Sequence, residues 1–261
     1  MLGAIIGDII GSRYEFHNTD NYNFELFGSG TSFTDDTICT IAIADAINTS
    51  KGKAPRYKDM LVSWCKSFPN PQGGYGGSFN RWIWSQDHEP YNSFGNGSAM
   101  RVAPVAWAYD DLNKVLAEAK RTASVTHNHP EGIKGAQAIA HAIYLLRTTR
   151  DLEVLHSLSM HYYPSMWVDV FTPGVFNETC QGTVPVAFKI ILASTSFEDA
   201  IRRAICWGGD SDTIGAIVGS MAEAAFGIPE EIYHKAFTYI TPEMDRVIAS
   251  FFNKLNNKHH G

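Results

Sequence analysis

The sequence predicts an all-α protein built as one compact domain. Its long segments space apolar residues as helices do, rather than in the alternation typical of strands. No two strand-like runs are joined by a convincing Asn-Gly or Asp-Gly turn. The 261 residues are 44% hydrophobic, which suffices for a large core and lies near the upper size of a single domain. We therefore expect one domain over residues 1–261, with a polar tail from about residue 254.

The first predicted helix, residues 1–14, places Gly3, Gly7 and Gly11 four apart on one stripe. Glycine inside a helix costs roughly 0.5–1 kcal/mol relative to alanine, so this stripe indicates that another backbone passes close by. We expect this helix to be central. Gly-, Asn- and Ser-rich loops at 69–77 and 88–97 are where we expect ligand contacts. The other predicted helices are residues 34–48, 56–66, 112–124, 130–147, 152–160, 183–193, 197–207, 213–226 and 229–239.

The composition excludes several classes of function. A net charge of −6 without a concentrated basic segment argues against a nucleic-acid surface or an anionic-membrane surface. No apolar run reaches the roughly 18 residues of a membrane span, and no signal peptide is recognisable. The 4 cysteines are widely spaced without a C-x-x-C pair, which favours reduced thiols over disulfides or zinc. We expect a cytoplasmic protein.

Clusters of acidic and hydroxyl side chains stand at the starts of two predicted helices. They are Thr34, Asp35 and Asp36 in the first cluster, and Asp210, Asp212 and Thr213 in the second. Helix capping explains either cluster alone, because Thr and Asp are preferred caps and carboxylates interact favourably with the helix dipole. Both helices continue as apolar runs, however, so both starts are expected to be half-buried.

Carboxylates at half-buried helix ends need positive partners, and neither cluster has a Lys or Arg beside it. A cation is the natural partner. Carboxylate and hydroxyl oxygens without His or Cys form a hard ligand set, which suits Mg²⁺, Mn²⁺ or Ca²⁺ rather than zinc or copper. Two such sets predict a binuclear metal site at the helix N-termini.

The first helix adds a third polar face, with Asp8, Ser12 and Glu15 at positions i, i+4 and i+7. An exposed helix face would explain these residues equally well. The glycine stripe on the same helix argues instead for burial against another helix, which would bring this face to the predicted metal site.

Five motifs together resemble the ADP-ribosylglycohydrolase family, which includes ADP-ribosyl-acceptor hydrolases and the dinitrogenase reductase activating glycohydrolase. The matching motifs lie in order along residues 3–213, and the first and last together are quite specific. They span residues 3–15 (GAIIGDIIGSRYE), 33–37 (FTDDT), 95–101 (GNGSAMR), 126–131 (THNHPE) and 208–213 (GGDSDT). The resemblance implies an orthogonal all-α fold.

The resemblance also implies a set of site residues. Two Mg²⁺ ions, or Mn²⁺, would be held by Thr34, Asp35, Asp36, Asp210, Asp212 and Thr213. Glu15 looks like the family's mobile acidic residue beside the metals, and Tyr75 would flank the distal ribose. His127 would lie near the phosphate or ribose, although a loop histidine that bonds the backbone explains it equally. The loop expected to receive the diphosphate and adenosine includes Ser93, Phe94, Gly95, Asn96, Gly97 and Ser98, and Gly-rich turns suit phosphate independently.

The implied reaction is hydrolysis of an N- or O-glycosidic bond at the distal ribose of an ADP-ribosylated protein or small molecule, with ADP-ribose as product. The metals would bind ribose hydroxyls and orient a water molecule, and Glu15 would transfer a proton at the leaving atom or at the water. Three alternatives remain: an ADP-ribose-binding module without activity, a metal-dependent phosphodiesterase, and a haloacid-dehalogenase-like phosphatase. The last is suggested by Asp210-x-Asp212, but that motif normally follows a strand, whereas residues 197–207 are predicted to be helical.

The linkage cleaved is the least direct prediction. As a class, the arginine-specific branch of the family carries an acidic residue near the loop that contains Tyr75. No Asp or Glu occurs between Phe68 and Gln86. The sequence therefore predicts that O-linked ADP-ribose is cleaved faster than the arginine adduct.

Overall fold

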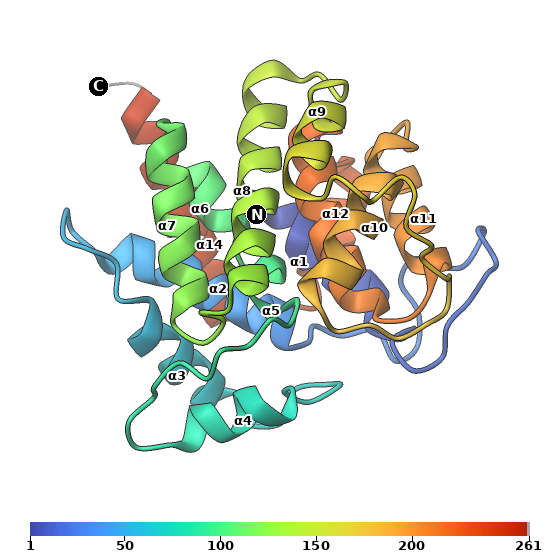
Figure 1. Cartoon of the computed structure of the whole chain (residues 1–261). Coiled ribbons are helices and arrows are strands. Elements are labelled where there is room, and N and C mark those ends of the chain that lie inside the picture. The colour runs from blue at the N-terminus through green and yellow to red at the C-terminus, as the bar shows by residue number, and fades with distance from the viewer. Residues whose placement is uncertain (260–261) are drawn as a thin grey trace.

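The computed structural model describes residues 1–259, with side chains described as far as residue 257. Over these residues the chain forms helices and isolated β-bridges but no strand (Figure 1), which confirms the all-α prediction. The helices are α1 (Leu2–Gly11), α2 (Asp35–Thr49), α3 (Tyr57–Ser67), α4 (Gly77–Trp84), α5 (Gly97–Met100), α6 (Ala103–Ala108), α7 (Leu112–Ser124), α8 (Pro130–Thr149), α9 (Val154–Tyr162), α10 (Cys180–Leu192), α11 (Phe197–Trp207), α12 (Ser211–Phe226), α13 (Glu230–Phe237) and α14 (Pro242–His259).

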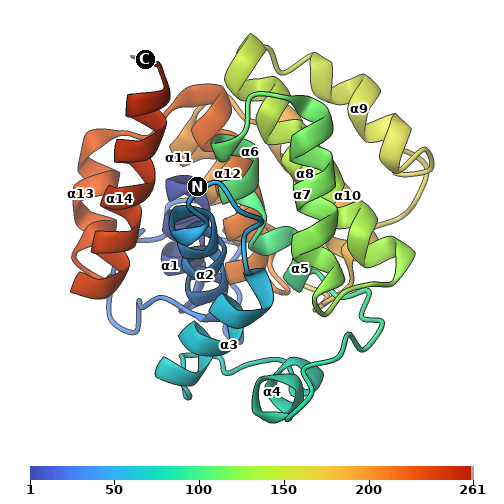
Figure 2. The ribbon, with the colours of Figure 1, turned by 90° about the vertical axis from the view of Figure 1, so that its left-hand side faces the viewer.

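Helix α1 lies in the middle of the fold, directly against α12 (Figures 1 and 2). The glycine stripe is the reason for this close approach. A Cβ atom added at Gly3 would lie 2.0 Å from the carbonyl oxygen of Gly219, and one added at Gly7 would lie 1.9 Å from that of Gly215. Both distances are far below van der Waals contact, so no larger residue fits between the two backbones. The prediction of a central first helix is confirmed.

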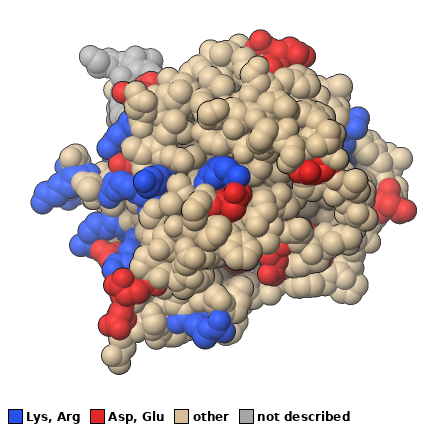
Figure 3. Space-filling view, in the orientation of Figure 1, with Lys and Arg blue, Asp and Glu red and all other residues tan. Residues whose placement is uncertain are grey.

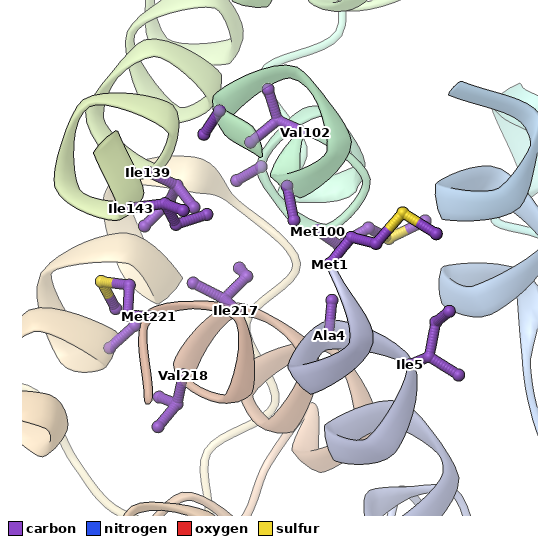
Figure 4. Packing of buried hydrophobic residues seen from close by; sticks show 14 of the residues in the cluster. Met1, Ala4, Ile5, Met100, Val102, Ile139, Ile143, Ile217, Val218 and Met221 are labelled. Carbon is purple, nitrogen blue, oxygen red and sulfur yellow. The ribbon is translucent and has the colours of Figure 1, made fainter. Parts of the chain in front are cut away.

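Buried aliphatic side chains fill the space between α8 and α12. In the close view of Figure 4, Ile139 and Ile143 of α8 lie over the part of α12 that carries Ile217 and Met221. All four side chains are fully buried. At roughly 1.5–3 kcal/mol for each fully buried side chain of this size, this packing holds α12 firmly from the side opposite α1.

Helix α14 continues through the segment predicted to be a polar tail. Its residues Met244, Ile248 and Phe251 are buried at helical spacing, and the side chain of Asn48 in α2 donates to the carbonyl of Val247 at 3.0 Å. This apolar face holds α14 on the domain, which explains why the helix extends to residue 259. Residues 260 and 261 of the predicted tail lie outside the described residues.

Charges of both signs mix on the face of the molecule shown in Figure 3. Basic side chains gather toward the left-hand edge of this view, with acidic side chains among them. On α7, for example, Arg121 and Glu118 form an ion pair at 2.7 Å. Among the described residues, no helix is both long enough and apolar enough to cross a membrane.

Candidate metal centre and active site

Three buried carboxylates from three helices meet beside the N-termini of α2 and α12. They belong to Asp8 of α1, Asp36 of α2 and Asp212 of α12. One oxygen atom from each carboxylate lies within 4.8 Å of the others, a spacing that could hold a metal ion. The structure thus brings together one carboxylate from each predicted cluster and adds Asp8, which sequence reasoning had placed on a polar face without including it among the ligands.

Asp8 is held in place by the first turn of α2. Its carboxylate accepts hydrogen bonds from the backbone N–H of Thr34 at 3.0 Å, from the Thr34 hydroxyl at 2.7 Å and from the N–H of Thr37 at 3.1 Å. Burial raises the pKa of Asp8 to about 6, although these hydrogen bonds partly oppose that shift. Thr34 is therefore N-cap of α2 and partner of Asp8 at once.

Among the described residues, no basic side chain pairs with the other two carboxylates of the cluster. Within the same part of the chain Asp36 Oδ1 is buried without a hydrogen bond, while Oδ2 accepts from the Thr213 hydroxyl at 3.2 Å. Burial raises the pKa of Asp36 and Asp212 well above the usual range, and neighbouring carboxylates raise both further. An all-oxygen set with a buried, unpartnered acceptor fits a hard divalent cation, because such a cation would neutralise several carboxylates at once.

A cavity of about 500 Å³ opens onto this cluster. Its volume falls in the range of sites for nucleotide-sized ligands. Most of the predicted site residues line it: Glu15, Asp35, Asp36, Tyr75, Ser93, Gly95, Asn96, Gly97, His127, Asp210, Asp212 and Thr213. The two loops expected to supply ligand contacts thus face the acidic helix starts across one cavity.

Three predicted site residues do not line the cavity. Thr34 is fully buried against Asp8. The Phe94 ring is 46% exposed and packs against the ring of His129, with 5.3 Å between their centroids. The Ser98 hydroxyl donates to the Gly132 carbonyl at 2.7 Å. The Ser98 side chain is thus occupied by a contact within the protein, whereas nearly half of the Phe94 side chain remains exposed.

Asn96 lines the cavity and also orients the carboxylate of Asp210. Its side-chain amide donates to Asp210 Oδ2 at 2.7 Å and to the Thr183 hydroxyl at 3.1 Å. Both amide hydrogens are therefore committed to the protein. This role depends on a contact between residues 114 positions apart, which no local sequence pattern reveals.

Glu15 lies just beyond α1, half-buried at the edge of the cavity. Its Oε2 atom is buried and has no hydrogen-bond partner among residues 1–257, whose side chains the structure describes. Burial, followed by the charges of Asp210 and Asp8, raises the pKa of Glu15 to about 7. A Cβ atom at Gly73, whose φ is +76°, would lie 2.5 Å from this Oε2. The glycine loop of residues 73–77 can therefore fold directly against the Glu15 carboxylate.

His127 is buried and its ring is oriented by a buried arginine. Arg101 Nη2 donates to the Thr126 hydroxyl at 2.9 Å, and that hydroxyl lies 2.6 Å from His127 Nδ1. Burial, followed by the charge of Arg101, holds the pKa of His127 well below its usual range. The ring is therefore neutral, with Nδ1 beside the Thr126 hydroxyl and Nε2 beside Gly97. Arg101 itself lines the cavity, although sequence reasoning gave it no role.

Tyr75 contributes its ring rather than its hydroxyl. The ring lines the cavity, while the hydroxyl donates to the Phe68 carbonyl at 2.7 Å. An aromatic surface at this position suits the face of a sugar or another flat ligand.

The all-α fold and the acidic cavity are those expected from the family that the sequence motifs resemble. A model of the ADP-ribosylglycohydrolase family matches residues 1–257, and the chain belongs to this family. Its relatives carry the names of hydrolases that act on ADP-ribosyl groups, so this chain is a member of a hydrolase family.

The relatives are distant in sequence but alike over most of their length. The chain is 25% identical to ADP-ribosylarginine hydrolase Tri1 of Pseudomonas putida, over 87% of this chain and 70% of that protein. It is 25% identical to the ADP-ribosyl-[dinitrogen reductase] glycohydrolase of Rhodospirillum rubrum, over 88% of this chain and 85% of that protein. Human ADP-ribosylhydrolase ARH3 is 26% identical, with coverage of 88% and 85%.

A solved structure described as an ADP-ribosylglycohydrolase-related protein complex has the same fold. It superimposes with a TM-score of 0.75 over 97% of this chain and 96% of that chain, at 21% sequence identity. The likeness in fold therefore extends over almost the whole molecule.

Proposed function

We propose that this protein is a metal-dependent hydrolase that releases ADP-ribose from an ADP-ribosylated protein or small molecule by cleaving the glycosidic bond at the distal ribose. The observation that carries the proposal is the juxtaposition of Glu15 and the Asp8–Asp36–Asp212 cluster at one cavity. The free state of all 4 cysteines supports a reducing, cytoplasmic location.

The proposed cofactor is a pair of Mg²⁺ ions, with Mn²⁺ as the other candidate. The proposed ligands are Thr34, Asp35, Asp36, Asp210, Asp212 and Thr213, joined by Asp8. When bound, these ions supply charge stabilisation and contacts to ribose hydroxyls and water. The protein itself holds Asp210 through Asn96 and Asp8 through Thr34, so the ligand set is oriented before any ion arrives.

Glu15 is the proposed proton-transfer group. Its carboxylate has one unpartnered oxygen and a pKa raised to about 7, so it can hold or accept a proton near neutral pH. In the same cavity, the glycine loop of residues 95–97 and the neutral ring of His127 offer uncharged contacts for the diphosphate. The Tyr75 ring is proposed to flank the distal ribose.

The overall proposal is tested by incubating the protein with ADP-ribosylated protein and, separately, with p-nitrophenyl phosphate, each with and without chelator. We expect chelator-sensitive release of ADP-ribose and no phosphatase activity. Release of nitrophenol would favour a metal-dependent phosphatase, and release of AMP from the ADP-ribosylated protein would favour a phosphodiesterase. Binding of ADP-ribose without turnover would favour a binding module.

Glu15→Gln is expected to lower turnover by roughly 100-fold or more while affinity for ADP-ribose stays within about tenfold, because it removes a positioned proton-transfer group and keeps the side chain's size. Single-turnover rates and calorimetric ADP-ribose titrations measure the two effects separately. Glu25→Gln, at an exposed carboxylate of the same segment, is the matched control. Equal losses in affinity and turnover would assign Glu15 a structural role.

Mg²⁺ is expected to raise the melting temperature, and more strongly at pH 7.5 than at pH 5. The folded-state pKa of Asp8 is raised to about 6, so without metal the folded protein binds more protons than the unfolded chain. Without metal, the free energy of unfolding therefore falls as the pH rises from about 4 to about 6. Bound Mg²⁺ offsets this loss, because it neutralises the repulsion between the ionised carboxylates of the cluster. Thermal scans with EDTA and with Mg²⁺ at both pH values test this. Identical melting temperatures in EDTA and in Mg²⁺ at pH 7.5 would contradict the metal site and would indicate that the acidic residues at the two helix starts act only as caps.

A further inference from the structure

A second cavity, of about 520 Å³, lies between the start of α3 and the end of α7. The segment of residues 88–90 forms its third wall. None of the residues that line it also lines the cavity of the proposed active site. Its volume falls in the range of small-molecule sites, so it has room for a ligand of its own.

Hydrogen bonds between α7 and the start of α3 hold two walls of this second cavity together. Arg121 Nη2 donates to the Pro55 carbonyl at 3.1 Å. The Tyr57 hydroxyl donates to Glu118 Oε2 at 2.7 Å, and Arg121 Nη1 donates to the same oxygen at 2.7 Å. Because Glu118 is buried, these contacts fix α3 against α7 and the cavity is formed before any ligand binds.

The second cavity carries more positive than negative charge, although the whole chain has a net charge of −6. Its basic lining residues are Arg56, Lys58, Lys120 and Arg121, and its acidic ones are Asp59 and Glu89. Arg56 pairs with Asp59 at 3.1 Å. Among the described residues, the exposed ammonium groups of Lys58 and Lys120 have no ion pair or hydrogen bond, and neither has the Glu89 carboxylate. Two free cations therefore face one free carboxylate.

Two free ammonium groups from separate helices favour a ligand with more than one negative charge. Each ammonium offers three hydrogen-bond donors, and a phosphate group carries nearly two negative charges near neutral pH. Pro55, Pro90 and Val125 add apolar surface to the same cavity, which suits the organic part of a phosphate ester. The chemistry of the cavity therefore fits a small phosphate-bearing molecule.

Two short segments of the chain contribute to both cavities. Residues 88–90 line the second cavity, while Tyr91 and Ser93, which follow them, line the active cavity. In the same way Val125 lines the second cavity and His127 lines the active cavity. A ligand in the second cavity would thus contact the segments that supply Tyr91 and His127.

The first of these segments lies between two residues with left-handed backbone. His88 and Asn92 have φ values of +49° and +54°, a conformation that costs roughly 1–2 kcal/mol for most residues. The two segments also contact each other: Asn92 N donates to Asn128 Oδ1 at 2.7 Å, and the ring centroids of Tyr91 and His127 lie 6.1 Å apart. A change in one segment therefore alters the surroundings of the other.

We propose that the second cavity is an effector site, which binds a small phosphate-bearing molecule such as a diphosphate or a nucleotide and thereby strengthens binding of ADP-ribose in the active cavity. A ligand that fixes residues 88–90 and Val125 also fixes Tyr91 and His127, so that ADP-ribose loses less conformational entropy when it binds. The binding site stands independently of the proposed function, whereas its coupling to ADP-ribose rests on that function.

Calorimetric titrations with pyrophosphate and with ADP, both in EDTA, test the binding site. The wild type should bind both, and the tighter probe shows whether a free diphosphate or a nucleotide is the source of the phosphate group. The double variant Lys58→Gln/Lys120→Gln should weaken one binding event by about tenfold or more, because it removes two charge-assisted contacts. Lys66→Gln/Lys235→Gln changes the net charge equally at exposed positions outside the cavity and should keep the wild-type affinity.

Titrations with ADP-ribose test the coupling. Without pyrophosphate, the wild type and Lys58→Gln/Lys120→Gln should bind ADP-ribose equally. With saturating pyrophosphate, the wild type should bind ADP-ribose about fivefold more tightly than the double variant, at the lower end of typical coupling between sites. Direct competition by pyrophosphate in the active cavity would affect both proteins alike, so it does not produce this difference.

An unchanged pyrophosphate titration in Lys58→Gln/Lys120→Gln, or an equal loss in Lys66→Gln/Lys235→Gln, would overturn the second binding site. Equal affinities of the wild type and the first double variant for ADP-ribose at saturating pyrophosphate would overturn the effector role. If the wild type binds no ADP-ribose under either condition, the proposed function is overturned together with the coupling, and the pyrophosphate titration still decides whether the second site exists.

Discussion

Replacing Asp212 with asparagine is expected to lower release of ADP-ribose by about 100-fold to 1000-fold or more, the scale at which single preorganised charged groups contribute to catalysis. Asp212 provides one of three buried carboxylates whose oxygens lie within 4.8 Å of one another. The amide keeps the shape of the side chain but removes a charge from the proposed ligand set. Single-turnover assays at saturating Mg²⁺ measure the loss.

The same substitution should leave the metal-free protein as stable as the wild type or more stable. Burial and neighbouring carboxylates raise the pKa of Asp212, so its ionised form is unfavourable when no cation is present. Melting in EDTA separates this effect from a folding defect. Asp245→Asn, in the first turn of α14, is the control for a helix-start carboxylate outside the cluster. Wild-type turnover by Asp212→Asn at low Mg²⁺ would rule out the proposed ligand role.

The second large effect is on stability and comes from Gly7→Ala. The added methyl group would lie 1.9 Å from the Gly215 carbonyl oxygen, so α1 and α12 must separate. Overpacking of a core typically costs about 1–3 kcal/mol, and backbone has little freedom to give way, so we expect a loss of about 3 kcal/mol or more. Activity should fall as well, because Asp8 moves with α1. Denaturant unfolding measures the stability change.

Gly76→Ala is the control for this glycine substitution. Nothing lies within 4 Å of a Cβ atom at Gly76, whose φ is −51°. Its free energy of unfolding should stay within about 1 kcal/mol of the wild-type value. Equal stability losses in the two variants would show that the close approach of α1 and α12 is not what makes Gly7 necessary.

Local patterns predicted most of the helices, and short length or non-local packing accounts for segments that were not predicted. The segment of residues 197–207 was predicted with the bounds of α11, because its apolar face repeats cleanly at helical spacing. Helices α5 and α6 are short, at 4 and 6 residues, and offer too few turns for that signal. The end of α14 depends on packing against α2, which a polar sequence does not reveal.

The part of the site that could be predicted from the sequence is the set of acidic residues at the starts of two helices. Asp36 and Asp212 were predicted to belong to one binuclear metal site, and the structure brings their carboxylates together. The parts that were not predicted depend on contacts across the fold: Asp8 as a third carboxylate and Asn96 as the partner of Asp210. Residue type suggested a polar role for each of them, but only the tertiary arrangement identifies the partner.

The close fit of α1 against α12 also sets the order in which the molecule can assemble. Helix α1 ends at residue 11 and α12 ends at residue 226, so most of the chain must be synthesised before the two backbones can meet. At ribosomal speeds of about 5–20 residues per second, this delay is on the order of 10 to 40 s. During that time α1 can pack against α2, but its glycine-bearing face lacks the α12 backbone that covers it in the finished fold. The acidic cavity, whose Asp210 and Asp212 lie at the start of α12, can therefore form only after this helix has been made.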